Sequence, residues 1–410
     1  MLKKYFRTNV IAVVIASLFS ISVVSQAAAD GITWTSRTSA DNNWYSVAYG
    51  NGLFVAVGYT EGTGNQVMTS ADGITWTSRT SAADNTWVGV TYGNGLFVAV
   101  SITGTGNRVM TSADGITWTS RTAASNNGWR SVAYGNGLFV AVSWTGTGNR
   151  VMTSPDGITW TSRTSAADND WLLVTYDNGL FVAVSRTGTG NRVMTSPDGI
   201  TWTSRTSAAD NQWWSVTYGN GLFVAVSYDG TNRVMTSSDG ITWTSRTAAA
   251  DNQWWSVTYG NGLFVAVSDS GIGNRVMTSS DGITWTSRTS AANNGWRSVA
   301  YGDGLWVAVS NTGTGNRVMT SGEIGLAART TAAANAEAAR VAAANAEAVR
   351  KAKEQRELTE ILALIPKIGE LTLSLGETTK SLYSTKCVKG KTIKYVNKGS
   401  KCPKGYVKKK

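Results

Sequence analysis

Histidine is absent from the 410 residues, and only two cysteines are present, Cys387 and Cys402. Without histidine the chain lacks the commonest metal ligand and the side chain most often used as a general base near neutral pH. Two cysteines are too few for a cysteine-rich zinc site. We therefore expect neither a metal nor a cofactor.

Lysine is absent from residues 30–321, which contain 16 Arg and 18 acidic residues, a net charge of −2. Residues 322–385 balance eight basic against eight acidic side chains, whereas residues 386–410 contain ten Lys and no acid. The formal net charge of +11 therefore belongs mainly to the tail. Such a tail favours a polyanionic partner, for which cell-wall polymer, lipid head groups and nucleic acid are the candidates.

Residues 1–29 have the layout of a secretory signal. Three basic residues within the first seven precede an apolar run, residues 10–24, and small residues surround Ala27 and Ala29. We expect cleavage after Ala27 or Ala29, no transmembrane segment afterwards, and a protein that is secreted or associated with the cell envelope. A retained membrane anchor is the alternative, and the run is shorter than the ~20 residues of a spanning helix.

A repeat of 41 or 42 residues dominates the chain. The segment "DGITWTSRT" begins at seven positions: Asp30, Asp72, Asp114, Asp156, Asp198, Asp239 and Asp281. Each period holds four short runs rich in Val, Thr, Trp and Tyr, here named a, b, c and d, with a Gly-rich "GNG" turn between a and b. Four strands in about 40–45 residues are typical of a propeller blade. The sequence predicts an all-β, seven-bladed β-propeller over residues 30–321.

The repeat starts and ends out of phase. Residues 32–38 form a d run with no a, b or c before it, while residues 296–321 supply a, b and c with no d after them. We expect these two pieces to complete one blade, because this 3+1 closure removes an unpaired sheet edge. Seven Trp in the a runs and seven at the d runs are expected to supply most of the packing between blades.

The segments "SADGITW", "SPDGITW" and "SSDGITW" resemble the Asp-box (bacterial neuraminidase) repeat of sialidase-like β-propellers. That pattern is Ser-x-Asp-x-Gly-x-Thr-Trp, and here one residue is missing between Asp and Gly. The resemblance implies that the box is a folding device at the c–d turn, away from the active site. The seven structural Asp-box residues would be Asp30, Asp72, Asp114, Asp156, Asp198, Asp239 and Asp281, with bound calcium as the alternative.

The resemblance also raises the question of an enzyme. Sialidases of this architecture use three Arg, a Tyr–Glu pair and an Asp acid, and they carry an Arg-Ile-Pro motif that this sequence lacks. The only Glu in residues 30–321 is Glu61. Asp168, Asp170, Asp229 and Asp269 break the repeat symmetry without a recognisable set of catalytic partners. We expect no catalytic residues and no enzyme, with a sialidase-like glycoside hydrolase as the second alternative.

The seven copies differ mainly in their d–a and b–c loops. Strand direction alternates, so these loops share one face of the ring. The residue after the a-run Trp and the residue opening the b–c loop include many Trp, Tyr and Arg, the residues enriched at binding hot spots. The ligand-binding candidates are Tyr45, Arg130, Trp144, Arg186, Trp214, Tyr228, Trp255 and Arg297. Neutral drift of unconstrained loops is the alternative explanation.

Beyond the propeller, residues 322–385 are rich in Ala, Glu, Arg and Lys and predict a helical arm. The arm is either a solvated spacer or, over residues 326–375, a short coiled coil that could oligomerise. Residues 386–410 predict a Lys-rich hairpin closed by a Cys387–Cys402 disulfide.

Together these features predict an exported binding or adhesion protein that recognises a glycan or anionic surface polymer through the variable face. A protein-interaction or assembly platform at the cell surface is the alternative, and nucleic acid is the least expected partner.

Overall fold

The structure is a computed structural model that describes residues 30–59, 64–321, Gln355 and 384–409. These residues form two compact units, the ring of residues 30–321 and a small sheet within residues 384–409. The predicted signal, the predicted arm and Glu61 lie outside the described residues, apart from Gln355 and the last two positions of the arm.

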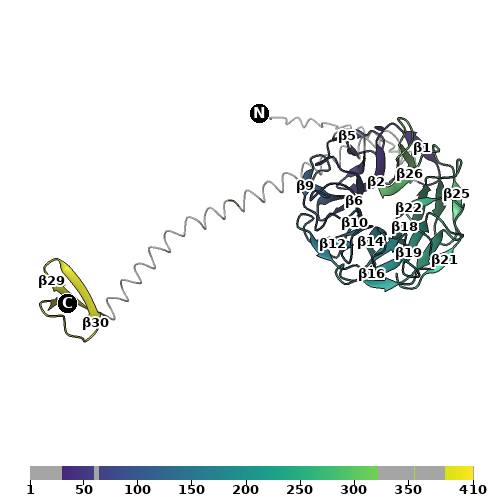
Figure 1. The fold of residues 1–410 in the computed structure, drawn as a ribbon. Helices are drawn as coiled ribbons and strands as arrows, with labels where there is room; N and C mark the ends of the chain where they lie inside the picture. Colours follow the sequence, from purple (N-terminus) through teal and green to yellow (C-terminus); the bar gives the residue numbers. More distant parts are fainter. Residues whose placement is uncertain (1–29, 60–63, 322–354, 356–383, 410) are drawn as a thin grey trace, which may run out of the picture. The chain divides into compact units, whose positions relative to one another are not determined.

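The ring consists of seven four-stranded antiparallel sheets, as predicted for a seven-bladed propeller (Figure 1). Their innermost a strands are β2 (Asn43–Gly50), β6 (Trp87–Gly93), β10 (Trp129–Gly135), β14 (Trp171–Asp177), β18 (Trp213–Gly219), β22 (Trp254–Gly260) and β26 (Trp296–Gly302). The b strands are β3 (Leu53–Tyr59), β7 (Leu96–Ser101), β11 (Leu138–Ser143), β15 (Leu180–Ser185), β19 (Leu222–Ser227), β23 (Leu263–Ser268) and β27 (Leu305–Ser310).

The c strands are β4 (Val67–Ser70), β8 (Val109–Ser112), β12 (Val151–Ser154), β16 (Val193–Ser196), β20 (Val234–Ser237), β24 (Val276–Ser279) and β28 (Val318–Ser321). The outer d strands are β5 (Thr77–Arg79), β9 (Thr119–Arg121), β13 (Thr161–Arg163), β17 (Thr203–Arg205), β21 (Thr244–Arg246), β25 (Thr286–Arg288) and β1 (Trp34–Arg37). Blades are numbered 1 to 7 in the order of their a strands.

Ring closure follows the predicted 3+1 arrangement. Strand β1 pairs antiparallel with β28, and Trp34 lies opposite Ser321. The Ser and the Asp of the seventh Asp box lie at opposite ends of the repeat region. They are in contact in the structure, because Ser321 Oγ donates to Asp30 Oδ1 over 3.2 Å. Blade 7 is therefore built from both ends of the repeat region, and its outer edge is no more exposed than that of any other blade.

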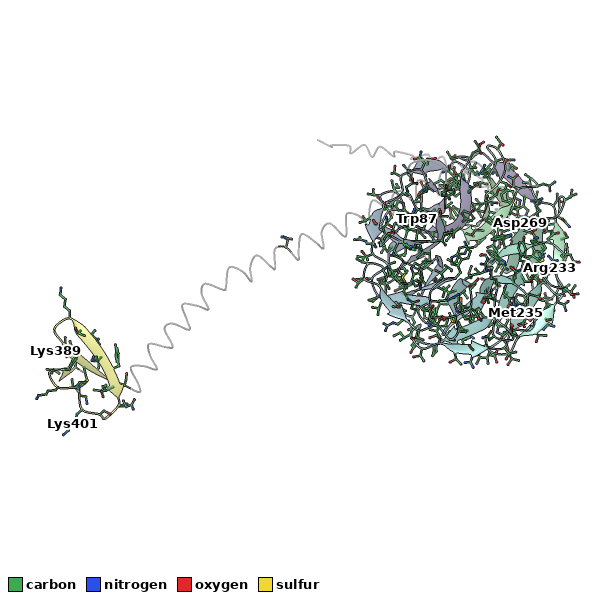
Figure 2. The ribbon with its side chains drawn as sticks, viewed as in Figure 1. Trp87, Arg233, Met235, Asp269, Lys389 and Lys401 are labelled. Carbon is green, nitrogen blue, oxygen red and sulfur yellow. A yellow bond between two sulfur atoms is a disulfide. The ribbon has the colours of Figure 1, made fainter. Side chains whose placement is uncertain are left out.

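Hydrophobic side chains fill the spaces between adjacent blades (Figure 2). In one such layer, Val55 and Val57 of blade 1 pack against Trp87 and Phe97 of blade 2. All seven a-strand Trp are fully buried, and Trp87 is one of them. Fully burying a side chain of this size removes about 150–250 Å² from water, so these residues hold the blades together as the sequence predicts.

The turns follow the expected local chemistry. In blade 2 the a–b turn places Asn94 at φ 49° and Gly95 at φ 75°, the two positive values that a type I′ hairpin turn requires. At the c–d turn, Asp281 Oδ1 accepts hydrogen bonds of 2.8 Å from Ser279 Oγ and from the amides of Ile283 and Thr284. The bond from the Thr284 amide, with those from Ile283 and Ser279, lowers the pKa of Asp281 to about 2.

The d strands are shorter than predicted. In blade 1 the run "ITWTSRT" that the repeat predicts as the d strand covers residues 74–80, whereas β5 spans only Thr77–Arg79. The reason is the Asp box itself, because the amides of Ile74 and Thr75 donate to Asp72 and are thereby held in the turn.

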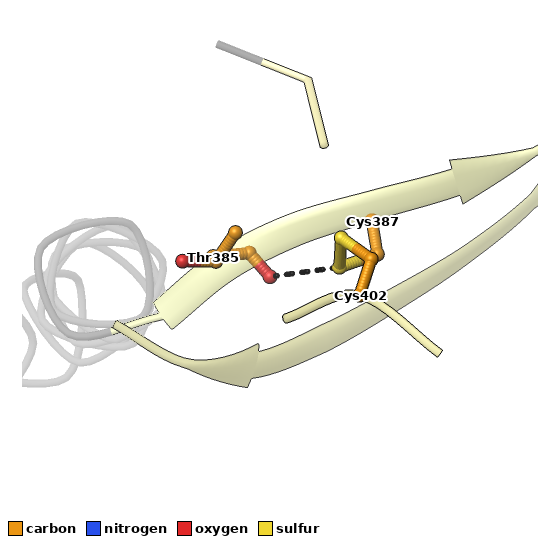
Figure 3. The surroundings of a disulfide bond; sticks show 3 residues. All are labelled: Thr385, Cys387 and Cys402. Carbon is orange, nitrogen blue, oxygen red and sulfur yellow. Dashed lines mark hydrogen bonds between the residues drawn. A yellow bond between two sulfur atoms is a disulfide. The ribbon is translucent and has the colours of Figure 1, made fainter. Parts of the chain in front are cut away.

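The second unit is a three-stranded antiparallel sheet of β29 (Ser384–Lys389), β30 (Thr392–Asn397) and β31 (Val407–Lys408). The predicted Cys387–Cys402 disulfide is present, with Cα atoms 5.7 Å apart and the Thr385 carbonyl oxygen 3.8 Å from Cys387 Sγ (Figure 3). Lys389 and Lys401, labelled in Figure 2, are exposed residues of this unit. In the part of the chain that the structure describes, no helix is long and apolar enough to cross a membrane.

Candidate binding site at the mouth of the central channel

Every a strand carries a β-bulge at the residue that follows its buried Trp. In blade 3, for example, Trp129 and Ser131 both pair with β11 and the register shifts between them, at Arg130. A bulge turns the extra residue away from the regular alternation of the strand. The seven bulge residues are Tyr45, Val88, Arg130, Leu172, Trp214, Trp255 and Arg297, and all of them line one cavity of about 230 Å³.

The next residue of each a strand forms a second ring around the channel. Five blades have Ser there, and each hydroxyl accepts a hydrogen bond from a Val amide of the following blade, as Ser131 does from Val174 over 3.2 Å. Blades 2 and 4 have Gly89 and Leu173 instead, so the amides of Val132 and Val216 cannot form this bond. The sevenfold symmetry is therefore broken beside Arg130 and Trp214.

Arginine and aromatic side chains form a continuous cluster across blades 3 to 7, here called the mouth cluster. The Arg130 guanidinium carbon lies 5.2 Å from the Trp144 ring centroid and 5.5 Å from that of Trp214, and Arg186 lies 5.0 Å from Trp144. These distances are typical of cation–π contacts.

On the other side of the cluster, the Trp214 and Trp255 ring centroids are 3.8 Å apart, and Tyr228 contacts both at 6.1 and 6.0 Å. Arg297 lies 3.6 Å above Trp255. Because guanidinium groups and neighbouring rings contact the aromatic faces, much of the aromatic surface is already used within the protein.

The charges of the mouth cluster are not balanced. Asp269, labelled in Figure 2, lies 3.1 Å from Arg297, and Asp170 is shared by Arg186 at 3.0 Å and Arg150 at 2.9 Å. The side chain of Arg130 forms neither an ion pair nor a hydrogen bond with the described residues, and its Nε is buried without an acceptor. Burial lowers the pKa of Arg130 to about 10, so its guanidinium group stays charged at neutral pH.

Several hydrogen-bond donors of the cluster are buried without a partner among the described residues. They are Arg130 Nε, Trp214 Nε1, Trp255 Nε1 and Arg297 Nε. A buried donor that lacks an acceptor costs about 1–3 kcal/mol, and such groups in native proteins call for an explanation. Two acceptors of the b–c loops of blades 6 and 7, Asp269 Oδ1 and Asn311 Oδ1, are also buried without a partner among the described residues.

The eight ligand-binding candidates come together at this mouth. Tyr45, Arg130, Trp214, Trp255 and Arg297 line the cavity. From the b–c loops, Trp144 and Tyr228 contact these residues, and Arg186 contacts Trp144. The two loop sets also share a face as predicted, since the Trp144 amide in a b–c loop donates to Gly128 in a d–a loop. Whether these residues bind a ligand stays a prediction.

Sequence reasoning missed other parts of the mouth. The ring of Ser residues is visible in the sequence, because five copies have Ser two residues after the a-run Trp. No sequence pattern indicates the bulge. The acidic residues that break the repeat symmetry do have partners: Asp170 and Asp269 pair with Arg, Asp168 lies 3.7 Å from Arg150, and Asp229 accepts from the Gln212 amide over 2.7 Å.

The Arg residues at the start of the c strands have a local role. Arg108 Nε donates to Gly104 O, and its Nη1 donates to the carbonyl oxygens of Ile102 and Asn127, all within 2.9 Å. These bonds close the b–c loop and tie it to the next blade. Among the described residues, no group of three or more His, Cys, Asp or Glu side chains could hold a metal ion.

The fold and this cavity define a seven-bladed β-propeller with one candidate binding site on its axis. No protein-family model matches the sequence, and no curated protein matches it significantly. Streptogramin B lyase is similar in structure, with a TM-score of 0.60 and 11% identity over 70% of this chain and 97% of the lyase.

YCF48 bound to D1 peptide has a TM-score of 0.54 and 14% identity, covering 72% of this chain and 96% of YCF48. YCF48 from Cyanidioschyzon merolae has a TM-score of 0.53 and 14% identity, covering 71% and 98%. At such identities the likeness extends to the propeller fold alone.

Proposed function

We propose that this chain is an exported binding protein whose propeller holds one partner at the channel mouth. The observation that carries the proposal is the mouth cluster, whose residues line a cavity of about 230 Å³ and include buried donors without acceptors. A cavity of this size admits one protruding group of a larger partner rather than a whole ligand of drug size, for which about 300–1,000 Å³ is usual.

The asymmetry of the mouth favours a single partner bound once. A multivalent lectin would repeat a similar pocket in every blade, whereas the bulge position holds Tyr, Val, Arg, Leu and Trp in different blades. A protein partner that inserts one segment into the axis is the first candidate. The complex of YCF48 with a D1 peptide supports it, because that propeller of similar fold binds a peptide.

A glycan or surface polymer is the second candidate. Trp144 and Tyr228 are half-buried at the rim, and aromatic side chains beside hydrogen-bond donors suit sugar rings. The contacts that Arg130, Arg186 and Arg297 make with the Trp rings argue against stacking as the main mode of recognition, since they leave less of each face for a sugar.

We infer that the protein is not an enzyme. Asp170 and Asp269, the carboxylates beside the mouth cluster, are held in ion pairs with Arg186 and Arg297, so neither is free to act on a ligand in the cavity. The hydrogen bonds of the Asp-box turns support the resemblance to sialidase-like propellers as a folding motif, and a sialidase-like hydrolase stays the second alternative. In this proposal the export signal, arm and Lys-rich tail carry the propeller to an anionic cell surface.

The test compares the full-length protein with a mouth variant, Arg130→Leu, Trp214→Leu and Arg297→Leu. Leu is the residue that blade 4 has at the same position, Leu172, so the fold tolerates it there. The control is Arg288→Leu, which makes the same kind of change on the outer strand β25, outside the cavity. All three proteins are probed on a peptide array and on an array of glycans and wall polymers.

The proposal expects signals that the parent and the control share and the mouth variant loses. Loss confined to peptides supports a protein partner, and loss confined to the other array supports a glycan. Binding that all three proteins retain would contradict a site at the mouth, and would leave the Lys-rich tail as the part that binds.

A further inference from the structure

The mouth cluster offers more hydrogen-bond donors than the protein itself uses. Four buried N–H groups, on Arg130, Trp214, Trp255 and Arg297, have no acceptor among the described residues. The Val132 amide, two residues beyond Arg130, lacks the Ser acceptor that five other blades provide, because residue 89 is Gly. A ligand that fits here must therefore supply acceptors.

Glycine at position 89 is tied to the shape of this site. A Cβ at Gly89 would lie 2.8 Å from the Arg130 carbonyl oxygen and 3.2 Å from Ser131 Cα, so blades 2 and 3 approach too closely there for any side chain. The missing hydroxyl therefore follows from the packing of the two strands, and the surroundings of Arg130 stay rich in donors.

The net charge of the site also points to an anion. Asp170 and Asp269 neutralise Arg186 and Arg297, whereas no carboxylate of the described residues pairs with Arg130. Arg130 and Arg297 are close enough to repel each other, and Tyr45 lines the same cavity. Three blades therefore contribute polar side chains to the lining of the cavity, with one uncompensated positive charge.

We propose that the channel mouth contains an anion subsite in which Arg130 and the indole N–H of Trp214 bind one carboxylate or phosphate group of the partner. This rests on the proposed function and names the chemistry of the group that enters the cavity. The planar guanidinium fork matches both oxyanions, and a site with low water access strengthens such charge-assisted bonds. Because Arg side chains contact the faces of the Trp rings, the oxyanion is bound by the indole N–H group at the edge of the ring.

The test is an NMR titration of the ¹⁵N-labelled full-length protein. The indole N–H signals of the 18 Trp are well separated from the amide signals, and Trp214→Phe assigns the signal of interest. Sodium acetate and sodium phosphate are added in separate experiments, with sodium chloride at equal ionic strength as the reference.

We expect the Trp214 signal to shift and saturate with acetate, with phosphate or with both, and the two arms tell which oxyanion fits. Arg130→Leu should weaken that binding at least about tenfold, the usual effect of removing a charged hydrogen-bond donor. Arg288→Leu, on the outer strand β25 and outside the cavity, should leave it unchanged.

Arg130→Lys keeps the charge without the fork and is expected to bind more weakly than the parent. It also tests the proposal if Arg130→Leu does not fold. The proposal would be overturned if the Trp214 signal of the parent shows no saturable shift. It would also be overturned if both Arg130 variants bind the anion as tightly as the parent. If a partner found on the arrays depends on the mouth while acetate and phosphate do not bind, the proposed function stands and the anion subsite falls.

Discussion

Trp34 is expected to hold strand β1 in blade 7 and so to close the ring. Trp34→Ala tests this expectation, with Trp202→Ala as the comparison. The two side chains are 8% and 9% exposed, and each indole donates to a Gly carbonyl three residues earlier. Their strands are connected to the ring in different ways. Strand β1 joins the ring through the chain at its C-terminal end, whereas β17 is joined at both ends. Losing Trp34 should therefore release β1 without unfolding the ring.

The magnitude follows from the side chain removed. Trp→Ala in a core costs about 3–5 kcal/mol, and each 1.4 kcal/mol is tenfold in an equilibrium constant. Hydrogen exchange of the β1 amides should thus accelerate by at least about 100-fold in Trp34→Ala, while amides in other blades change little. Trp202→Ala should lower the protection of the whole ring more evenly. Uniform loss of protection in both variants would refute this role of Trp34 in ring closure, as would unchanged exchange in β1.

Three further predictions concern other parts of the molecule. The pKa of Asp281 is lowered on folding, so its contribution to stability is present above pH ~4 and is lost as the pH falls toward about 2. Asp281→Asn should therefore make stability, followed by circular dichroism, less dependent on acid pH. An unchanged acid profile would contradict this. Reducing Cys387–Cys402 should cost the small sheet about 3 kcal/mol, seen as faster hydrogen exchange there and not in the propeller. A double-mutant cycle of Asp269→Asn and Arg297→Leu should give a coupling of about 0.5–3 kcal/mol in urea denaturation, and additive effects would show that the ion pair contributes nothing.

The blades could be predicted because their determinants are local. The Asn-Gly pair at residues 94–95 selects a type I′ turn, and seven copies of one pattern leave little doubt about strand number. The closure of β1 on β28 followed from counting strands, since the chain held one d run too many at its start and one too few at its end.

The candidate site could be predicted only in part. Comparing the copies located the variable residues, but it did not pair them. Arg130 contacts Trp214 two blades away, and Asp269 meets Arg297 across a blade boundary. Such contacts depend on the radius of the ring and on the bulges, neither of which leaves a signal in one copy of the repeat.

The bulge at the start of each a strand separates what the ring needs in order to fold from what it shows to a partner. Trp129 and Ser131 keep their pairing with β11 whatever stands between them, and the other blades repeat this arrangement with Tyr, Val, Leu or Trp in that place. Seven codons could thus be rewritten without disturbing the repeat. Copies of one blade become a combinatorial scaffold, and a new recognition surface needs no change in architecture.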